Sequence, residues 1–142
     1  MSFHNAPTTF VSHVHLYVSH VEHSLKFYQE VLGFSILERV DDLVILTADG
    51  STPIVTLETP KHLEARNPKS TGLYHFAILL PSRNDLARFV MHLLKMKIRF
   101  GVSDHLVSEA IYFSDPDLNG IEVYVDRHPD TCSVRKMEFY CL

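Results

Sequence analysis

Three residues in this sequence have the types and positions of a metal site: His13, His75 and Glu122. Each lies in a segment where apolar and polar residues alternate, and each is on the polar side of that alternation. Two imidazoles and one carboxylate suit a divalent transition metal and leave coordination positions open. A strand histidine is more often a hydrogen-bonded side chain than a ligand, so the pattern alone leaves both interpretations open.

The strands that must position these residues are recognisable from the period of two. In residues 9–18 the apolar face carries Val14, Leu16 and Val18, and the other face carries His13, His15 and Tyr17. The same parity puts His75 opposite Phe76, Ile78 and Leu80, and Glu122 opposite Ile121, Val123 and Val125. Because apolar faces pack against helices, we expect all three candidate ligands on faces that line a cavity.

The elements of the first half follow the order βαβββ. Ser19 opens the pattern SHVE, a capping box with Glu22, which predicts a helix that ends near Gly33. Three short strands are expected at residues 34–40, 43–48 and 53–58, separated by Asp41-Asp42 and by the Asp49-Gly50 turn.

The second half repeats this order after residues 59–71, which contain two prolines and are expected to be a linker. Residues 72–80 are expected to form a strand, Ser82 caps a helix running to about Met96, and strands follow near 98–102, 109–114 and 121–125. Superposing His13 on His75 also aligns Phe27 with Phe89. The sequence therefore predicts an α+β fold: one domain, residues 1–142, made of two βαβββ modules at about 9–58 and 72–125.

Length, charge and composition exclude several classes of protein. A chain of 142 residues fits one domain, and its 46% hydrophobic content is ordinary for a globular protein. The formal charge is −4 and the 13 Lys and Arg residues are dispersed, which argues against a nucleic-acid partner. No apolar run or amino-terminal signal pattern suggests a membrane, so a cytoplasmic location is expected. Cys132 and Cys141 are assigned no role.

Three stretches of the chain carry a family resemblance. They are HVHLYVSHVEHSLKFYQEVLGF at 13–34, GLYHFAILLPSRNDLARF at 72–89 and SDHLVSEAIYFSDPDLNGIEVYVDR at 103–127. Together they resemble the glyoxalase, bleomycin-resistance and extradiol-dioxygenase families, which form the vicinal oxygen chelate superfamily. The resemblance implies a cupped mixed sheet built from the two modules.

The resemblance also implies a ligand set. By position, the family ligands of the first, fifth and eighth strands fall on His13, His75 and Glu122, which are the residues that strand parity selects. In the glyoxalase branch a fourth ligand comes from the strand at 53–58, which nominates Glu58.

Residues 103–122 are similar to the signature of ring-cleaving extradiol dioxygenases, the catechol 2,3-dioxygenase-like branch. The matching residues are His105, the pair Ile111-Tyr112, the pair Asp115-Pro116 and Glu122. Two positions depart from the signature. Ser103 replaces another small or apolar residue, and Leu118 occupies a turn position that is usually Gly or Pro.

The extradiol branch implies iron(II)-dependent cleavage of a catechol with dioxygen, in which His105 acts as acid and base and Tyr112 hydrogen-bonds a substrate oxygen. Taken alone, His105 is a loop histidine and Tyr112 a core aromatic. Two other functions stay open: a glyoxalase-like lyase or isomerase with Glu58 as fourth ligand to zinc or nickel, and a non-catalytic, resistance-type binding protein. Manganese is a further alternative metal, and each reading implies a small-molecule ligand.

Many ring-cleaving relatives carry two such domains in tandem, so this chain is expected to correspond to half of that layout. A second subunit would then supply the missing surface, most simply in a two-fold homodimer. The apolar and aromatic residues of the carboxyl-terminal segment, namely Met137, Phe139, Tyr140 and Leu142, are candidates for that interface.

Overall fold

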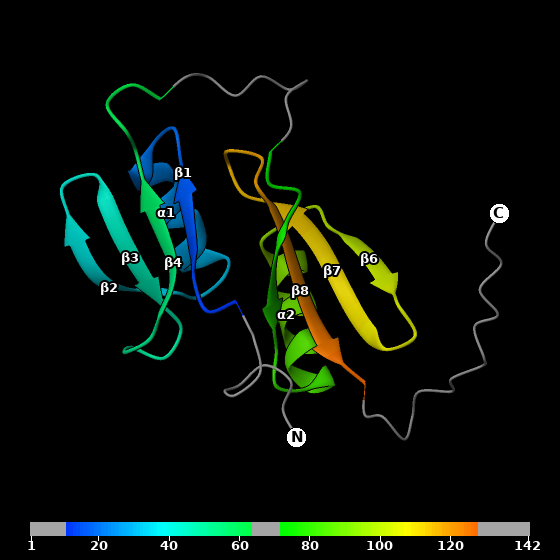
Figure 1. The fold of residues 1–142 in the computed structure, drawn as a ribbon. Helices are drawn as coiled ribbons and strands as arrows, with labels where there is room; N and C mark the ends of the chain where they lie inside the picture. Colours follow the sequence, from blue (N-terminus) through cyan, green and yellow to red (C-terminus); the bar gives the residue numbers. More distant parts are fainter. Residues whose placement is uncertain (1–10, 64–71, 128–142) are drawn as a thin grey trace, which may run out of the picture. The chain divides into compact units, whose positions relative to one another are not determined.

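The computed structural model describes residues 11–63 and 72–127. Within them the chain forms two compact units. The first contains residues up to Tyr74 together with Ser114–Asn119, and the second contains His75–Phe113 and the residues from Gly120 onward. In the described residues each unit contains one sheet and one helix, whose course can be followed in Figure 1.

The first unit has the order βαβββ. Its elements are β1 (Val14–Tyr17), α1 (Val21–Glu30), β2 (Ser35–Val40), β3 (Leu43–Thr47) and β4 (Pro53–Glu58). The strands lie in the order β1-β4-β3-β2, with β1 parallel to β4 and the other pairs antiparallel.

The second unit repeats that arrangement. Its elements are β5 (Phe76–Leu79), α2 (Arg83–Lys95), β6 (Gly101–Asp104), β7 (Ser108–Ser114) and β8 (Gly120–Asp126). The order is β5-β8-β7-β6, with β5 parallel to β8. The fold expected from the sequence is therefore confirmed: two four-stranded mixed sheets, each with one helix.

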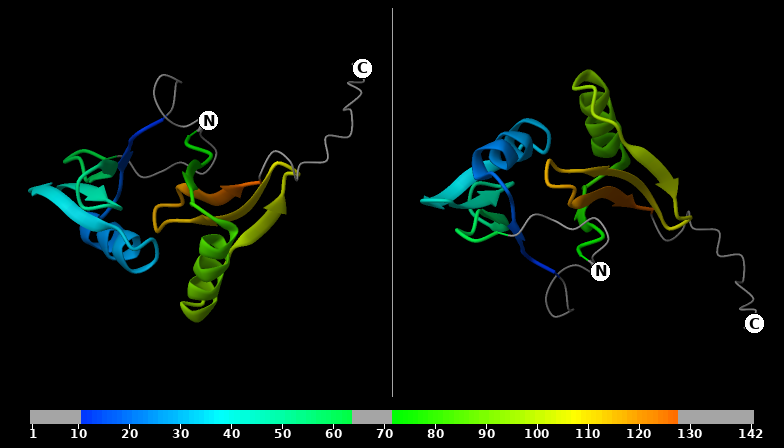
Figure 2. Two further views of the ribbon diagram at one scale, coloured as in Figure 1. Left: turned by 90° about the horizontal axis from the view of Figure 1, so that it is seen from below. Right: turned by 90° about the horizontal axis from the view of Figure 1, so that it is seen from above.

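Each helix covers one face of its own sheet (Figure 2). In the first unit α1 packs on β3 and β4, and in the second α2 packs on β8. The side chains between helix and sheet are buried and apolar, as alternation predicts: Leu16, Leu25, Val44, Leu46, Val55 and Leu57 in one unit, and Phe76, Leu86, Leu93, Ile121 and Val123 in the other. The opposite face of each sheet carries the polar candidates.

The helix starts and stops were predicted with mixed success. Ser82 caps α2 as expected, because its hydroxyl accepts from the backbone N–H of Asp85 at 3.3 Å. The capping box at Ser19 is wrong: the N-cap of α1 is His20, which makes no side-chain cap, and Ser19 instead bonds to Asp117. Gly33 does end the α1 segment, with a φ of 75° and its N–H donating to the carbonyl of Gln29.

The strands expected to carry the two histidines are shorter than predicted: β1 begins at Val14 and β5 at Phe76, so His13 and His75 each lie one residue before the strand and not within it. The bounds also differ at β6. It was expected at residues 98–102 and lies at Gly101–Asp104, because α2 is followed by a turn in which Lys97 has a φ of 57° and the N–H of Ile98 bonds back to Leu93. Part of the expected linker, 64–71, and the candidate interface residues beyond 127 lie outside the described residues. None of the helices in the described part of the chain has the length and apolar character to cross a membrane.

Candidate metal centre

His75 and Glu122 are neighbours in the second unit. Phe76 and Ile121 pair across the parallel strands β5 and β8 and face the helix. His75, which immediately precedes β5, and Glu122, which follows Ile121 on β8, therefore share the other face. His75 Nε2 lies 2.9 Å from Glu122 Oε2, and the two side chains are 29% and 13% exposed.

Tyr112 and His105 extend this contact into a chain of four side chains. Tyr112, on β7, donates its hydroxyl hydrogen to Glu122 Oε1 over 2.8 Å. His105, in the turn between β6 and β7, places Nε2 2.8 Å from the same hydroxyl oxygen. Because Tyr112 has one hydroxyl hydrogen and gives it to the carboxylate, His105 Nε2 must be the donor in the second bond. The residues that the sequence selected in this unit are thus brought together.

The distance between His75 and Glu122 fits a shared divalent ion. The 2.9 Å between Nε2 and Oε2 is a hydrogen-bond distance, so the two donor atoms are close enough to serve as ligands of one ion. An imidazole nitrogen and a carboxylate oxygen are also the donor types that zinc and iron(II) accept. The pair fits two neighbouring ligands of such an ion.

His13 and Glu58 make different contacts in the first unit. His13 Nε2 lies 2.8 Å from Thr56 Oγ1, and Glu58 Oε2 lies 2.8 Å from His15 Nε2. Glu58 is therefore a neighbour of His15, and Thr56 is the neighbour of His13. Among the residues that the structure describes, no three His, Cys, Asp or Glu side chains gather as a metal site.

The repeat explains why Thr56 lies beside His13. Aligning His13 with His75 also aligns His15 with Ala77. Since His15 pairs with Thr56 and Ala77 pairs with Glu122, Thr56 is the counterpart of Glu122. Sequence reasoning missed Thr56, although the repeat together with strand pairing was the signal that locates it.

The turn between β7 and β8 leads into Glu122 and is held by Asp115. This carboxylate is 3% exposed, and it accepts from the backbone N–H groups of Asp117 and Asn119 and from the hydroxyl of Tyr28 at 3.0 Å. Burial raises the pKa of Asp115, and burial followed by the charge of Asp115 raises the pKa of Tyr28. Leu118 lies in this turn with a φ of 63°, in the left-handed region that favours glycine.

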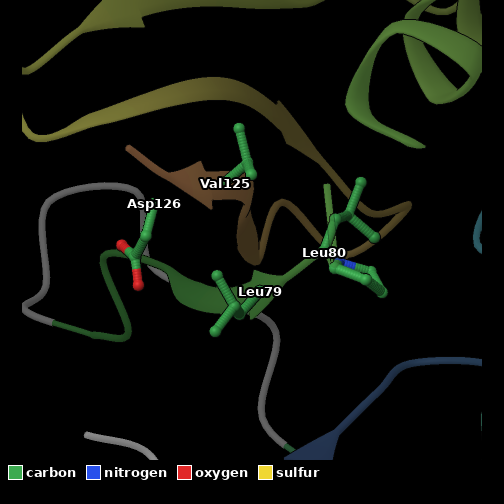
Figure 3. A pocket seen from close by; sticks show the side chains of 5 residues that line it. Leu79, Leu80, Val125 and Asp126 are labelled. Atoms are coloured by element: carbon green, nitrogen blue, oxygen red, sulfur yellow. The ribbon is translucent and has the colours of Figure 1, made fainter. Parts of the chain in front are cut away.

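A hollow of about 400 Å³ lies at the carboxyl ends of β5 and β8, and Figure 3 shows the side chains that line it. Its lining consists of Leu79, Leu80, Pro81, Val125 and Asp126. The four side chains of the hydrogen-bonded chain do not line it. The candidate centre and this hollow are therefore separate features of the second unit.

Comparison with known proteins gives a family match over most of the chain. The model of the Glyoxalase/Bleomycin resistance protein/Dioxygenase superfamily matches residues 10–123. Catechol-2,3-dioxygenase of Bacillus subtilis (strain 168) is 44% identical over 124 residues, which are 87% of this chain and 44% of that protein. Biphenyl-2,3-diol 1,2-dioxygenase 2 of Rhodococcus globerulus is 30% identical over 117 residues, 81% of this chain and 62% of that protein. This chain therefore spans about half the length of these curated relatives.

The fold also matches solved structures. A glyoxylase/bleomycin resistance protein/dioxygenase domain from Frankia sp. EAN1pec aligns with a TM-score of 0.67 at 23% identity, covering 85% of this chain and 94% of that one. At this identity the likeness concerns the fold alone.

Proposed function

The chain belongs to the glyoxalase/bleomycin resistance protein/dioxygenase superfamily, and on that premise we propose that it is a metal-dependent extradiol dioxygenase that cleaves a catechol ring with dioxygen. The observation that carries the proposal is the chain of contacts from His105 through Tyr112 and Glu122 to His75. The similarity to two dioxygenases that act on dihydroxylated aromatic rings supports the same activity.

In this proposal His75 and Glu122 would hold iron(II), with His13 as the third ligand that the family resemblance implies. A bound iron(II) ion would supply open coordination positions for the two catechol oxygens and for dioxygen. To bind it, His75 would have to present an unprotonated Nε2 to the ion in place of its 2.9 Å contact with Glu122. Glu58 is left out of the ligand set because its carboxylate contacts His15, and because it lies two residues beyond Thr56, the counterpart of Glu122.

His105 and Tyr112 act on the substrate. His105 is exposed in its turn, and because Nε2 carries the proton that it donates to Tyr112, Nδ1 is the ring nitrogen that can accept a proton from a catechol hydroxyl and later return it. Tyr112 is half-buried and lies between His105 and the carboxylate, from where its hydroxyl can bond a substrate oxygen. Protons removed from the substrate thus have a defined acceptor beside the ligand Glu122.

The test begins with full-length protein purified without oxygen or chelators. Metal content is measured first, and the protein is then reloaded separately with iron(II), zinc, nickel or manganese. A panel of substituted catechols is assayed for oxygen uptake and for the yellow ring-opened product. We expect both signals with iron(II), and none with zinc or nickel.

Three variants assign the roles. His105→Ala should lower turnover by about 10²-fold or more while keeping the metal, because only proton transfer is lost. Glu122→Ala should lose both metal and turnover. His23→Ala is the control, since His23 is exposed on α1 and lies outside the chain of contacts.

The alternatives make different predictions in the same experiment. Fully iron-loaded protein that consumes no oxygen with any catechol would contradict the dioxygenase proposal. Isomerase or lyase activity with zinc or nickel would then favour the glyoxalase-like function. A protein that takes up no metal would favour the non-catalytic binding function.

A further inference from the structure

The turn that carries His105 is not held by burial. His105, Leu106 and Val107 join β6 to β7, and the last two are 71% and 59% exposed. Leu106 has a φ of 68°, a left-handed conformation that is unfavourable for a residue with a side chain. Polar contacts must therefore maintain the turn in this conformation.

Arg127, the residue after β8, supplies polar contacts to this turn. Its backbone N–H donates to the carbonyl of Val107 at 2.8 Å, and Nη1 donates to the carbonyl of Leu106 at 3.3 Å. Its Nη2 donates to Asp104 Oδ2 at 2.7 Å and to Glu109 Oε1 at 2.8 Å. One guanidinium thus reaches both strands of the hairpin and the turn between them.

The carboxylates of Asp104 and Glu109 lie at the end of the hairpin, next to the turn that carries His105. Asp104 and Glu109 are paired residues of β6 and β7. Asp104 Oδ1 also accepts from the N–H of Leu106 at 2.9 Å, which fixes the left-handed residue from its other side. Hydrogen bonds from Arg127 keep the pKa of both carboxyls below their usual ranges, so both are anionic acceptors at neutral pH.

Only an arginine can make this set of contacts. The guanidinium has five N–H donors in a planar fork, whereas a lysine ammonium is a single point on a flexible stem. The Arg127 side chain is 27% exposed, so solvent only partly competes for these bonds. Arg83, from α2, also donates to Glu109, at 2.7 Å, and this makes Glu109 shared between two cations.

We propose that Arg127 is a positioning residue for His105: it clamps the β6–β7 hairpin so that the imidazole Nε2 stays at the Tyr112 hydroxyl. The side-chain hydrogen bonds of Arg127 go to Asp104, Leu106 and Glu109, so it acts on His105 through the hairpin and its turn. The inference rests on the proposed function for its catalytic consequence. The positioning itself concerns contacts within the second unit and can be tested without metal or substrate.

The first test uses metal-free, full-length protein with ¹⁵N-labelled histidine at pH 8, where an ordinary imidazole is neutral. Long-range ¹H–¹⁵N spectra report which ring nitrogen carries the proton, and His105→Gln assigns the signal. We expect the wild-type His105 to hold its proton on Nε2, since it donates to Tyr112. In Arg127→Gln the two nitrogen shifts should move to tautomer-averaged values, and the Leu106 amide should exchange at least about tenfold faster.

Two further variants separate positioning from general stability. Arg127→Lys keeps the charge and should give an intermediate effect. Arg88→Gln removes an exposed ion pair with Asp85 on α2, away from the hairpin, and should match the wild type. Exchange of the Leu93 amide, on the buried side of α2 in the same unit, reports whether a variant has lost stability in that unit as a whole.

In iron-loaded protein, Arg127→Gln should keep its metal and lose about 10- to 100-fold in kcat, because a small misplacement of an acid–base group has effects of this size. Wild-type tautomer and exchange signals in Arg127→Gln would overturn the proposal. So would an averaged tautomer in the wild type, or equal acceleration of the Leu93 and Leu106 amides in both Arg127 variants. If the tautomer responds as expected but no catechol is cleaved by any form, the positioning role stands and the proposed function fails.

Discussion

Replacing Tyr112 with phenylalanine removes one oxygen atom from the centre of the candidate site. The hydroxyl bonds Glu122 Oε1 and His105 Nε2, both at 2.8 Å, while the ring remains to pack against His75, with centroids 5.7 Å apart. The substitution therefore removes both hydrogen bonds and keeps the packing of the ring, so it measures the contribution of the hydrogen bonds alone.

The expected magnitude follows from these two bonds. A hydrogen bond to an ionised carboxylate contributes about 1.5–3 kcal/mol when buried, but Tyr112 is half-buried and water can replace its hydroxyl. We therefore expect the free energy of unfolding to fall by about 1 kcal/mol. Loss of a group that orients a metal ligand weakens metal binding by about 10- to 100-fold. Since Glu122 keeps its contact with His75, the lower figure, about tenfold or 1.4 kcal/mol, is expected.

The assay is competition for Zn²⁺ with a chromophoric chelator at neutral pH, because zinc is inert to oxygen and reports ligation alone. Chemical denaturation of the metal-free protein gives the stability change. Tyr124→Phe is the matched control, the same chemical change two residues beyond Glu122 on β8. A zinc affinity within twofold of wild type in Tyr112→Phe, or an equal loss in Tyr124→Phe, would refute the reasoning.

Three further outcomes are expected. Leu118→Gly should raise the free energy of unfolding by about 0.5–1 kcal/mol, because it relieves a left-handed φ of 63° at a residue that is 67% exposed, and a denaturation midpoint unchanged or lowered would contradict this. Several hydrogen bonds lower the pKa of Asp49 in the folded protein, and the one from the backbone N–H of Thr52 is the largest cause. The ionised Asp49 therefore stabilises the fold at pH values above the pKa of the unfolded chain, about 4. This stabilisation is lost as the pH falls through the lower pKa of the folded protein. The difference in Tm between wild type and Asp49→Ala should accordingly shrink on acidification from pH 7 to pH 2.5, and a constant difference would argue against the role. Finally, we propose a homodimer, which sedimentation at micromolar concentration should detect; a strict monomer would exclude it.

The sequence alone determined the order of the elements and the faces that carry the chemistry. Alternation is a local property of an extended chain, so the buried faces of β1, β5 and β8 could be assigned without tertiary information. The contact between His75 and Glu122 follows from that parity once β5 and β8 are known to pair. Ser82 was identified as a helix cap for the same reason, since its partner is only three residues away.

Only the tertiary structure decided which polar groups meet across long stretches of chain. Ser19 has the sequence pattern of a helix cap, yet its N–H and its hydroxyl both donate to Asp117, 98 residues later. The helix α1 instead begins at Val21, with His20 as its N-cap. The family resemblance nominates Glu58 as a ligand. Its contact with His15, and that of Thr56 with His13, depend on how β1 and β4 pair, which the sequence of either strand does not show. Arg127 carries no local signal, because its four acceptors on the β6–β7 hairpin become neighbours only when β8 packs beside β7. Local patterns fix which way a side chain faces, whereas its partner depends on the whole path of the chain.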